Sequence, residues 1–390
     1  MIMNILILSF YYPPDLSAGS FRTMALVNSL LKDTEKQVTI TVLTTQPSRY
    51  STYSPTASSI ERSGAVTIKR IPVAQRGSGV FGQALLFAQY ALGVNQAIKG
   101  KTYDLVFATS SRMMTASLGS WVARKLDAKL FLDLRDLLVD ALPDMLPMQL
   151  GSPAAWVLHY VERWTVVRAQ SVNLASPGFI KYFEKKYPGI PFTVHTNGVD
   201  DIFIEKVFSL PKPSAEKLNI LYAGNIGVGQ GLHRIIPQLA AQLTDKAQFV
   251  VIGCGRAANQ LKATLAQYKT TNVKVINPVK RADLIKYYQN ADVLFLHLND
   301  LPSLKTVIPS KLFEYAATEK PILGGLSGFS AEFASSNIAN IALFEPCDVQ
   351  SAMNALHKLH IGMTDRTDFI RKFSRKNIVK KMANELLQKT

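Results

Sequence analysis

The sequence predicts an α/β protein with two doubly wound, Rossmann-like domains, and three observations lead to this. The chain has 390 residues, enough for two domains at roughly 100 to 200 residues each. Hydrophobic residues make up 47% and charged residues 18%, which supplies two cores and excludes a disordered chain. Short apolar runs alternate with helical patterns along the chain, which is typical of parallel strands buried on both faces.

The expected strands and helices alternate along the chain, and the strands are too many for a single sheet. In the first half, strands are predicted at residues 4–10, 38–45, 66–72, 104–110, 129–133, 171–175 and 192–196, and helices at 20–31, 81–98 and 113–126. In the second half, strands are predicted at residues 218–223, 248–252, 273–276, 292–298, 321–323 and 341–344, and helices at 232–243, 257–268, 281–289 and 310–318.

Turn residues mark the boundary between the two halves. The stretch NGVD at 197–200 follows a strand, and Pro211, Pro213 and Ser214 precede the next one. We therefore predict an N-terminal domain over residues 1–200, a linker over 201–216 and a C-terminal domain over 217–364. The charged, amphipathic end, residues 365–390, should form a helical segment that packs back toward the N-terminal domain. Ligands of such folds bind where the strands end, in a cleft that we expect between the domains.

Several classes of protein are excluded by composition. The two cysteines, Cys254 and Cys347, form no disulfide framework and no zinc motif. The apolar opening MIMNILILSF has no basic region and no cleavage site, so we do not expect a signal peptide. The most apolar internal run, residues 84–94, is too short to span a bilayer. We expect a cytoplasmic protein.

The charge is unusually basic, with 44 Lys and Arg against 28 Asp and Glu, a net +16. This balance favours an anionic partner such as nucleic acid, anionic lipid or a phosphorylated small molecule. No zinc finger, aromatic RNA-binding motif or basic zipper accompanies it, so we predict no nucleic-acid partner. A solvated basic surface that maintains solubility explains the charge equally well.

Two loops after predicted strands could receive phosphate. In YYPPDLSAGS, Gly19 allows close approach of a ligand and Ser20 could cap the following helix. The ordinary alternative is a plain strand-to-helix turn. In YAGNIGVGQGL, four glycines fall within residues 224–231, which suits a loop whose amides wrap an anion. A flexible connector is the alternative here.

The third motif is SLKTVIPSKLFEYA at residues 303–316. Ser310 could cap a helix, and Lys311 in its first turn is unfavourable unless an anion occupies the site. Glu314 lies one turn later, where its two carboxylate oxygens could accept hydrogen bonds from a ribose diol. A solvent-facing glutamate, and solubilising charges at Lys305 and Lys311, are the ordinary explanations.

Together these segments resemble the retaining glycosyltransferases of family 4, which have the GT-B fold. The resemblance covers essentially the whole chain in order, and is carried by YYPPDLSAGSFR, NGVD, YAGNIGVGQGL, IGCGR, YYQNADVLFL and PSKLFEYAATEKPIL. The glycine loop and the last block are similar to bacterial transferases of surface-polysaccharide assembly, such as O-antigen, lipopolysaccharide or capsule, particularly the L-fucosamine type.

The resemblance implies roles for individual residues, with departures. Glu314 matches the second glutamate of the family's paired motif, which holds the ribose, whereas Thr306 stands in place of the first. Asn225 and Gln230 stand where the family commonly has Arg and Lys. The implied donor-binding residues are Gly19, Gly224, Asn225, Gly227, Arg256, Thr306, Ser310 and Glu314.

The resemblance also implies the chemistry. The donor is a UDP-sugar, no divalent metal or other cofactor is needed, and the diphosphate itself can take the acceptor proton while the anomeric configuration is retained. Positive charge would then stabilise the leaving phosphate. The strand ending DLRD at 133–136 has Arg135 where the family often has histidine, and a structural ion-pair cluster is an equal alternative for it. The implied catalytic residues are Lys305, Lys311, Arg135 and Asp136.

The acceptor implied by the resemblance is a saccharide linked to undecaprenyl diphosphate. Residues 80–98 contain many apolar side chains and could lie in an anionic membrane interface. That would give a peripheral position at the inner face of the cytoplasmic membrane, whereas burial in the core is the more frequent reason for such a helix.

We therefore predict a glycosyltransferase that moves a sugar, expected to be an N-acetylated amino sugar, from UDP to a lipid-linked saccharide. Two alternatives stay open. A UDP-sugar epimerase of the same fold would act on the donor without an acceptor. A nucleotide-sugar binding protein that has lost catalysis would bind UDP without turnover, which the replacements at Asn225, Gln230 and Thr306 allow.

Overall fold

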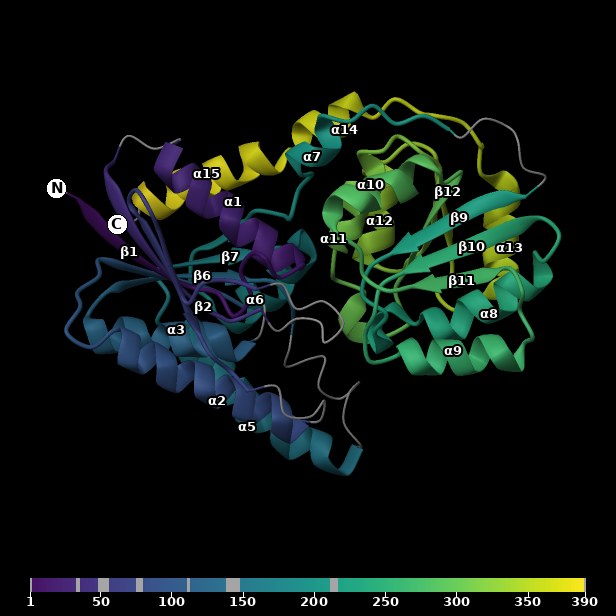
Figure 1. Ribbon diagram of the computed structural model, residues 1–390. Coiled ribbons are helices and arrows are strands. Elements are labelled where there is room, and N and C mark those ends of the chain that lie inside the picture. Colours follow the sequence, from purple (N-terminus) through teal and green to yellow (C-terminus); the bar gives the residue numbers. More distant parts are fainter. Residues whose placement is uncertain are drawn as a thin grey trace. The chain divides into compact units, whose positions relative to one another are not determined.

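The computed structural model describes residues 2–32, 36–47, 56–74, 80–110, 113–137, 148–210 and 217–388. The chain forms two compact units, Met1–Asn197 with Arg375–Thr390 (unit 1) and Gly198–Ser374 (unit 2). Each unit is a sheet with helices on both faces (Figure 1), so the predicted fold class is confirmed. The predicted linker residues 211–216 lie outside the described residues.

Unit 1 contains an eight-stranded sheet in the order β3-β4-β2-β1-β5-β6-β7-β8, parallel except for β3. Its strands are β1 (Met3–Leu8), β2 (Val38–Thr45), β3 (Ile60–Ser63), β4 (Val66–Ile71), β5 (Leu105–Thr109), β6 (Lys129–Leu134), β7 (Ser171–Leu174) and β8 (Phe192–Val194). Its helices are α1 (Ala18–Lys32), α2 (Val80–Ala97), α3 (Met113–Leu126), α5 (Met148–Val166), α6 (Ile180–Lys186) and α15 (Arg375–Gln388).

The C-terminal helix α15 belongs to unit 1. In Figure 1, α1 and α15 cover one face of the sheet, and α2, α3 and α5 cover the other. Met382, Leu386 and Leu387 of α15 are buried in one core cluster with Leu26 and Leu30 of α1. The apolar side chains of α15 recur at helical spacing and form one apolar side of the helix. This side packs together with α1 on the same face of the sheet.

Unit 2 contains a six-stranded parallel sheet in the order β11-β10-β9-β12-β13-β14. Its strands are β9 (Leu218–Ala223), β10 (Ala247–Ile252), β11 (Val273–Ile276), β12 (Val293–His297), β13 (Ile322–Gly325) and β14 (Ile341–Phe344). Its helices are α7 (Asp201–Ile204), α8 (Leu232–Gln242), α9 (Ala258–Gln267), α10 (Arg281–Gln289), α11 (Ser310–Ala316), α12 (Phe329–Asn337), α13 (Val349–Lys358) and α14 (Thr367–Lys372).

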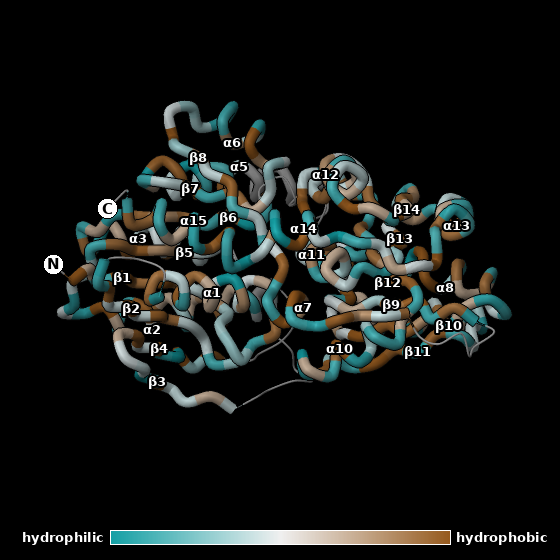
Figure 2. Tube along the Cα trace, turned by 90° about the horizontal axis from the view of Figure 1, so that it is seen from above, coloured by the Kyte–Doolittle hydropathy of each residue, from teal (hydrophilic) through white to brown (hydrophobic). Residues whose placement is uncertain are grey.

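The strands of both sheets are largely apolar (Figure 2), and in unit 2 they separate two core clusters. One cluster includes side chains from α10, α11 and α12, and the other includes side chains from α8 and α13. All strands of this sheet run parallel, so their carboxyl ends share one edge, and the loops that leave this edge carry the candidate site.

Candidate functional site

Two glycine-containing loops are joined at the carboxyl edge of the sheet in unit 2. After β9, the amides of Gly224 and Ile226 donate to the carbonyls of Ile252 and Cys254, both at 2.9 Å. In the loop after β10, a Cβ on Gly253 would collide with the Gly224 carbonyl oxygen, and φ is +150° there. The glycine is therefore required by the close approach of the two backbones.

A pair of neutral side chains closes the glycine loop. Asn225 Nδ2 donates to Gln230 Oε1 at 2.8 Å, and the Gly227 amide donates to the same oxygen at 3.1 Å. Asn225 and Gln230 occupy the two positions where the family resemblance leads us to expect basic residues. Here they bind each other, so this loop obtains its shape from an internal hydrogen-bond network and contributes no positive side-chain charge of its own.

His297, which was not predicted from the sequence, is hydrogen-bonded to this loop. The ring is fully buried at the end of β12, where its Nδ1 lies 2.7 Å from the Gln230 carbonyl and the Cys347 amide donates to its Nε2 at 2.9 Å. Burial lowers the pKa of His297 to about 4. A neutral imidazole that donates from Nδ1 and accepts at Nε2 satisfies both contacts, so His297 connects the glycine loop to the turn before α13.

Glu314 and Lys311 form a nearly buried ion pair on α11. Lys311 Nζ lies 2.6 Å from Glu314 Oε2, and the Tyr288 hydroxyl, from α10, lies 3.2 Å from the same oxygen. Only 8% of Glu314 is exposed, so it is not the solvent-facing glutamate of the ordinary explanation. Burial and the neighbouring carboxylate raise the pKa of Tyr288 well above its usual value, so its hydroxyl stays protonated and donates to Glu314.

Arg281, also missed from sequence, adds charge near this pair. It begins α10 and forms an ion pair with Asp200, and its guanidinium lies over the Phe203 ring at 5.4 Å. Burial lowers the pKa of Arg281, and the charge of Glu314 opposes that shift, which places the two charges within electrostatic reach.

The other predicted residues of unit 2 lie on the same edge but are more exposed. Lys305 is half-exposed and lies 3.5 Å from Asp300. Arg256 is exposed in the loop after β10, and Thr306 is half-buried in the segment that leads to α11. The prediction that Ser310 caps α11 is wrong, because Pro309 occupies the cap position and Ser310 is already the first helical residue.

In unit 1, Gly19 and its neighbours lie in the first turn of α1. The helix begins at Ala18, earlier than expected, and the Ser20 amide donates to Ser17 Oγ at 3.1 Å. Ser17 therefore caps this helix, and the prediction that Ser20 does so is wrong. Ser20 and Gly19 are both buried.

The stretch DLRD is divided between buried and exposed positions. Asp133 is fully buried and its carboxylate receives two bonds from Arg22, both 3.1 Å, and one from Asn173 at 2.6 Å. Burial raises the pKa of Asp133, but Arg22, Arg135 and these bonds outweigh it and lower the pKa. Asp133 is thus part of a structural ion-pair cluster, whereas Arg135 is half-buried and Asp136 is exposed.

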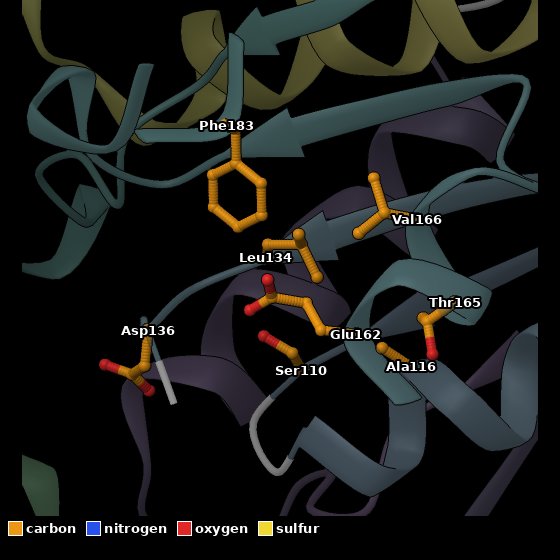
Figure 3. A pocket seen from close by; sticks show the side chains of 8 residues that line it. All are labelled: Ser110, Ala116, Leu134, Asp136, Glu162, Thr165, Val166 and Phe183. Carbon is orange, nitrogen blue, oxygen red and sulfur yellow. The ribbon is translucent and has the colours of Figure 1, made fainter. Parts of the chain in front are cut away.

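Arg135 and Asp136 lie at the carboxyl edge of the unit 1 sheet. Arg135 Nη2 donates to Asn197 Oδ1 at 3.2 Å, and its amide donates to Ser110 Oγ at 2.9 Å. Asp136 is part of the lining of a pocket (Figure 3). The pocket is lined by Ser110, Ala116, Leu134, Asp136, Glu162, Thr165, Val166 and Phe183.

Each half of the chain matches a known family model. Residues 22–198 match the model described as "Glycosyl transferase 4-like domain", and residues 204–375 match the one described as "Glycosyl transferases group 1". The chain is a glycosyltransferase. The predicted enzyme class is therefore confirmed, and each unit contains one of the two glycosyltransferase domains.

Solved structures show the same fold across the whole length of this glycosyltransferase. The Anabaena protein HepE in complex with UDP-glucose is 16% identical, covers 99% of this chain and 100% of its own, and has a TM-score of 0.67. The trehalose-phosphate synthase (UDP-forming) of Burkholderia xenovorans is 11% identical over 99% and 100%, with a TM-score of 0.67. WaaG, of lipopolysaccharide biosynthesis, is 15% identical over 97% and 95%, with a TM-score of 0.63.

No curated protein sequence matches the chain. The solved structures are glycosyltransferases of the GT-B fold, so they show that this glycosyltransferase has the same fold. In the described ranges, no helix is both long and apolar enough to cross a membrane. In the same ranges, no three His, Cys, Asp or Glu side chains are grouped where they could hold a metal ion.

Proposed function

We propose that this glycosyltransferase moves an N-acetylated amino sugar from a UDP donor to a lipid-linked saccharide, without a divalent metal and with retention of the anomeric configuration. The observation that carries the proposal is the nearly buried ion pair of Glu314 and Lys311 on α11, the helix that follows β12. A carboxylate held in place before a nucleotide arrives is suited to accept both hydroxyl protons of a ribose, at little cost in ordering.

The positive charge for the leaving diphosphate would come from lysines. Because Asn225 and Gln230 are neutral and the amides of Gly224 and Gly227 donate within the protein, the glycine loop supplies less positive potential than a basic loop would. Lys311 and Lys305 follow β12 at the same edge of the sheet. Fixed cations near a developing phosphate charge stabilise it most when they are partly shielded from water, which favours Lys311 over Lys305.

The comparisons support the donor and the biological setting. One structural neighbour contains UDP-glucose and another is described as UDP-forming. Two are described as lipopolysaccharide enzymes, the outer core galactosyltransferase WaaB and WaaG. We assign the saccharide acceptor to unit 1, where Arg135 and Asp136 lie at the carboxyl edge of the sheet.

A transfer assay tests the proposal. The protein is incubated with UDP-N-acetylamino sugars and an undecaprenyl-diphosphate-linked saccharide, and the lipid product is analysed by mass spectrometry and NMR. We expect the lipid to gain one sugar with the donor's anomeric configuration, in the presence of EDTA. Isomerised donor formed without acceptor would instead identify an epimerase.

The Asn225–Gln230 hydrogen bond favours a second candidate, a nucleotide-sugar binding protein without turnover. A neutral loop suffices to bind a nucleotide but gives less stabilisation to a leaving diphosphate. Tight UDP binding with no product from any donor and acceptor pair would establish this candidate and refute transfer.

A further inference from the structure

The pocket of Figure 3 is formed within unit 1 by the ends of two strands and by three helices. Ser110 directly follows β5, Leu134 is the last residue of β6, and the helical lining residues come from α3, α5 and α6. Among the described lining residues, Asp136 is exposed and the other seven are buried, which places the opening beside Asp136. The pocket is narrow, so it admits one small substituent of a ligand rather than a sugar ring.

One part of the pocket wall is apolar. Ala116, Leu134, Val166 and Phe183 line it, and each of them is almost completely buried. A methyl group that enters such a wall is removed from water, which favours its binding. A strongly hydrated group such as a phosphate would lose its water there without a matching charge, so this wall disfavours it.

Glu162 brings a buried carboxylate to the pocket. The residue is 6% exposed, and Figure 3 shows its carboxylate among the lining side chains. Its Oε1 accepts hydrogen bonds from the Tyr187 hydroxyl at 2.6 Å, the Tyr182 hydroxyl at 3.1 Å and Lys186 Nζ at 2.5 Å. No described residue donates a hydrogen bond to Oε2. The second carboxylate oxygen can therefore accept a hydrogen bond from a ligand.

Ser110 adds a hydroxyl that can donate. Its Oγ accepts a hydrogen bond from the Arg135 amide at 2.9 Å, and no described residue accepts the hydroxyl proton. The Thr165 hydroxyl differs, because it donates to the Val161 carbonyl at 2.7 Å and lies 2.9 Å from Ser117 Oγ. The pocket thus combines one acceptor and one donor with an apolar wall.

The charges around the pocket favour a neutral substituent. The ion pair with Lys186 already balances the charge of Glu162, so a second buried cation would lack a counter-charge. At the opening, the exposed carboxylate of Asp136 repels an anion. The ligand group that fits is uncharged, with an N–H or O–H donor, an acceptor oxygen and an apolar end.

We propose that this pocket binds the N-acetyl group of the acceptor sugar. The amide N–H would donate to Glu162 Oε2, the amide oxygen would accept from the Ser110 hydroxyl, and the methyl group would contact the apolar wall. A hydroxyl in place of the acetamido group would leave that wall uncovered. The inference rests on the proposed function in one respect, because it takes unit 1 to bind a saccharide acceptor.

Saturation-transfer NMR tests the subsite without a donor. The probes are the methyl glycosides of N-acetylglucosamine and N-acetylgalactosamine. We expect their acetyl methyl protons to receive the strongest saturation from the wild-type protein, and to lose it with Ser110→Ala and with Glu162→Gln. The exposed controls, Glu184→Gln on α6 and Ser336→Ala on α12, should keep it. No saturation from the wild type, or saturation that both pocket variants retain, would overturn the proposal.

Transfer kinetics test the subsite with complete acceptors. Undecaprenyl-diphosphate-linked N-acetylglucosamine and glucose differ in one group, and we expect the lower KM for the first. Ser110→Ala should raise that KM roughly three- to tenfold, the effect of one lost hydrogen bond, with little change in kcat. The KM for the glucose lipid should stay the same. Equal losses with both acceptors would show that Ser110 has a structural role and would overturn the proposal.

Ser110→Ala leaves the ion pair of Glu162 and Lys186 in place, so it tests the pocket even if Glu162→Gln does not fold. The thermal midpoint shows whether each variant is folded. Acetyl saturation that depends on Ser110, without transfer from any donor, would refute the transferase and leave the subsite supported. Transfer with the same KM for both acceptors would support the transferase and refute the subsite.

Discussion

At the residue scale, the account depends on Glu314. Its carboxylate is held by Lys311 at 2.6 Å and by the Tyr288 hydroxyl at 3.2 Å, both from within unit 2. Such contacts fix the rotamer of the carboxylate, so less side-chain entropy is lost when a ribose binds.

Replacement of Glu314 should weaken UDP binding. Glu314→Ala removes the proposed acceptor of the ribose hydroxyls, and leaving such buried groups unpaired costs about 1–3 kcal/mol. Calorimetric titration with UDP measures the loss, and the thermal midpoint shows that the variant is folded. Glu332→Gln, on the exposed side of α12, is the control. Unchanged UDP affinity in folded Glu314→Ala would contradict the ribose role.

The two lysines should differ in their effects. Lys305 is half-exposed beside Asp300, so Lys305→Ala should lower kcat with little change in UDP affinity. Lys311 also holds Glu314, so Lys311→Ala should lower both kcat and UDP affinity. Steady-state kinetics and UDP titration separate the two effects, with Lys262→Ala as the control. If the two variants lost the same UDP affinity and neither showed a specific loss of kcat, both roles would be contradicted.

At the element scale, the glycine loop is a folded element with its own polar core. Gln230 Oε1 accepts from both Asn225 and the Gly227 amide, and the Gln230 carbonyl meets His297. These contacts join the loop after β9 to β12 and to the turn before α13.

Removal of the Gln230 side chain should therefore loosen the loop. Gln230→Ala leaves two donors without their acceptor, which we expect to lower the free energy of unfolding by about 1–3 kcal/mol. UDP affinity should fall at the same time, because the loop is no longer held in place. Urea unfolding and UDP titration measure both, with the exposed Gln260→Ala on α9 as the control. A loop that only connects two elements would leave both quantities unchanged.

His297 should make the stability of unit 2 depend on pH. Its folded pKa is about 4, below the value of about 6.5 for an unfolded histidine. As pH falls from about 6.5 to about 4, the unfolded chain takes up a proton that the folded chain does not, so the free energy of unfolding decreases, by on the order of 3 kcal/mol.

Urea unfolding at a series of pH values checks this dependence. His297→Gln should remove that part of the decrease, whereas His357→Gln, on the exposed side of α13, should keep it. Parallel pH curves for the wild type and His297→Gln would mean that folding does not lower the pKa of His297.

Local apolar patterns were enough to predict most elements. Strands at residues 38–45, 218–223, 273–276 and 341–344 have the predicted bounds, because turn residues or charges flank each apolar run. The short edge strand β3 was missed since its residues are mostly exposed and polar. No helix was predicted over α5, where Gly151 and Pro153 interrupt the pattern, although both lie within the helix.

The candidate site was only partly accessible from sequence. Glu314 and Lys311 are three residues apart on one helix, so local spacing brings them together. His297 contacts Gln230 and Cys347, which are 67 and 50 residues away, and Tyr288 reaches Glu314 from another helix. Such contacts depend on the order of the strands in the sheet, and no local sequence pattern specifies that order.

At the scale of the whole molecule, we propose different tasks for the two units. We place the donor beside Glu314 and Lys311 of unit 2 and the acceptor beside Arg135 and Asp136 of unit 1, and both assignments are proposals. The net charge of +16 suits both a polyanionic donor and an anionic surface. The donor assignment is central, because the proposed transfer requires a bound nucleotide-sugar donor.

Calorimetric titration of the wild-type protein with UDP, GDP and ADP, each with and without EDTA, tests this assignment most directly. We predict selective binding of UDP with an affinity that EDTA does not change, because protein side chains rather than a metal hold the nucleotide. Binding of none of the three nucleotides, or UDP binding that EDTA abolishes, would contradict it.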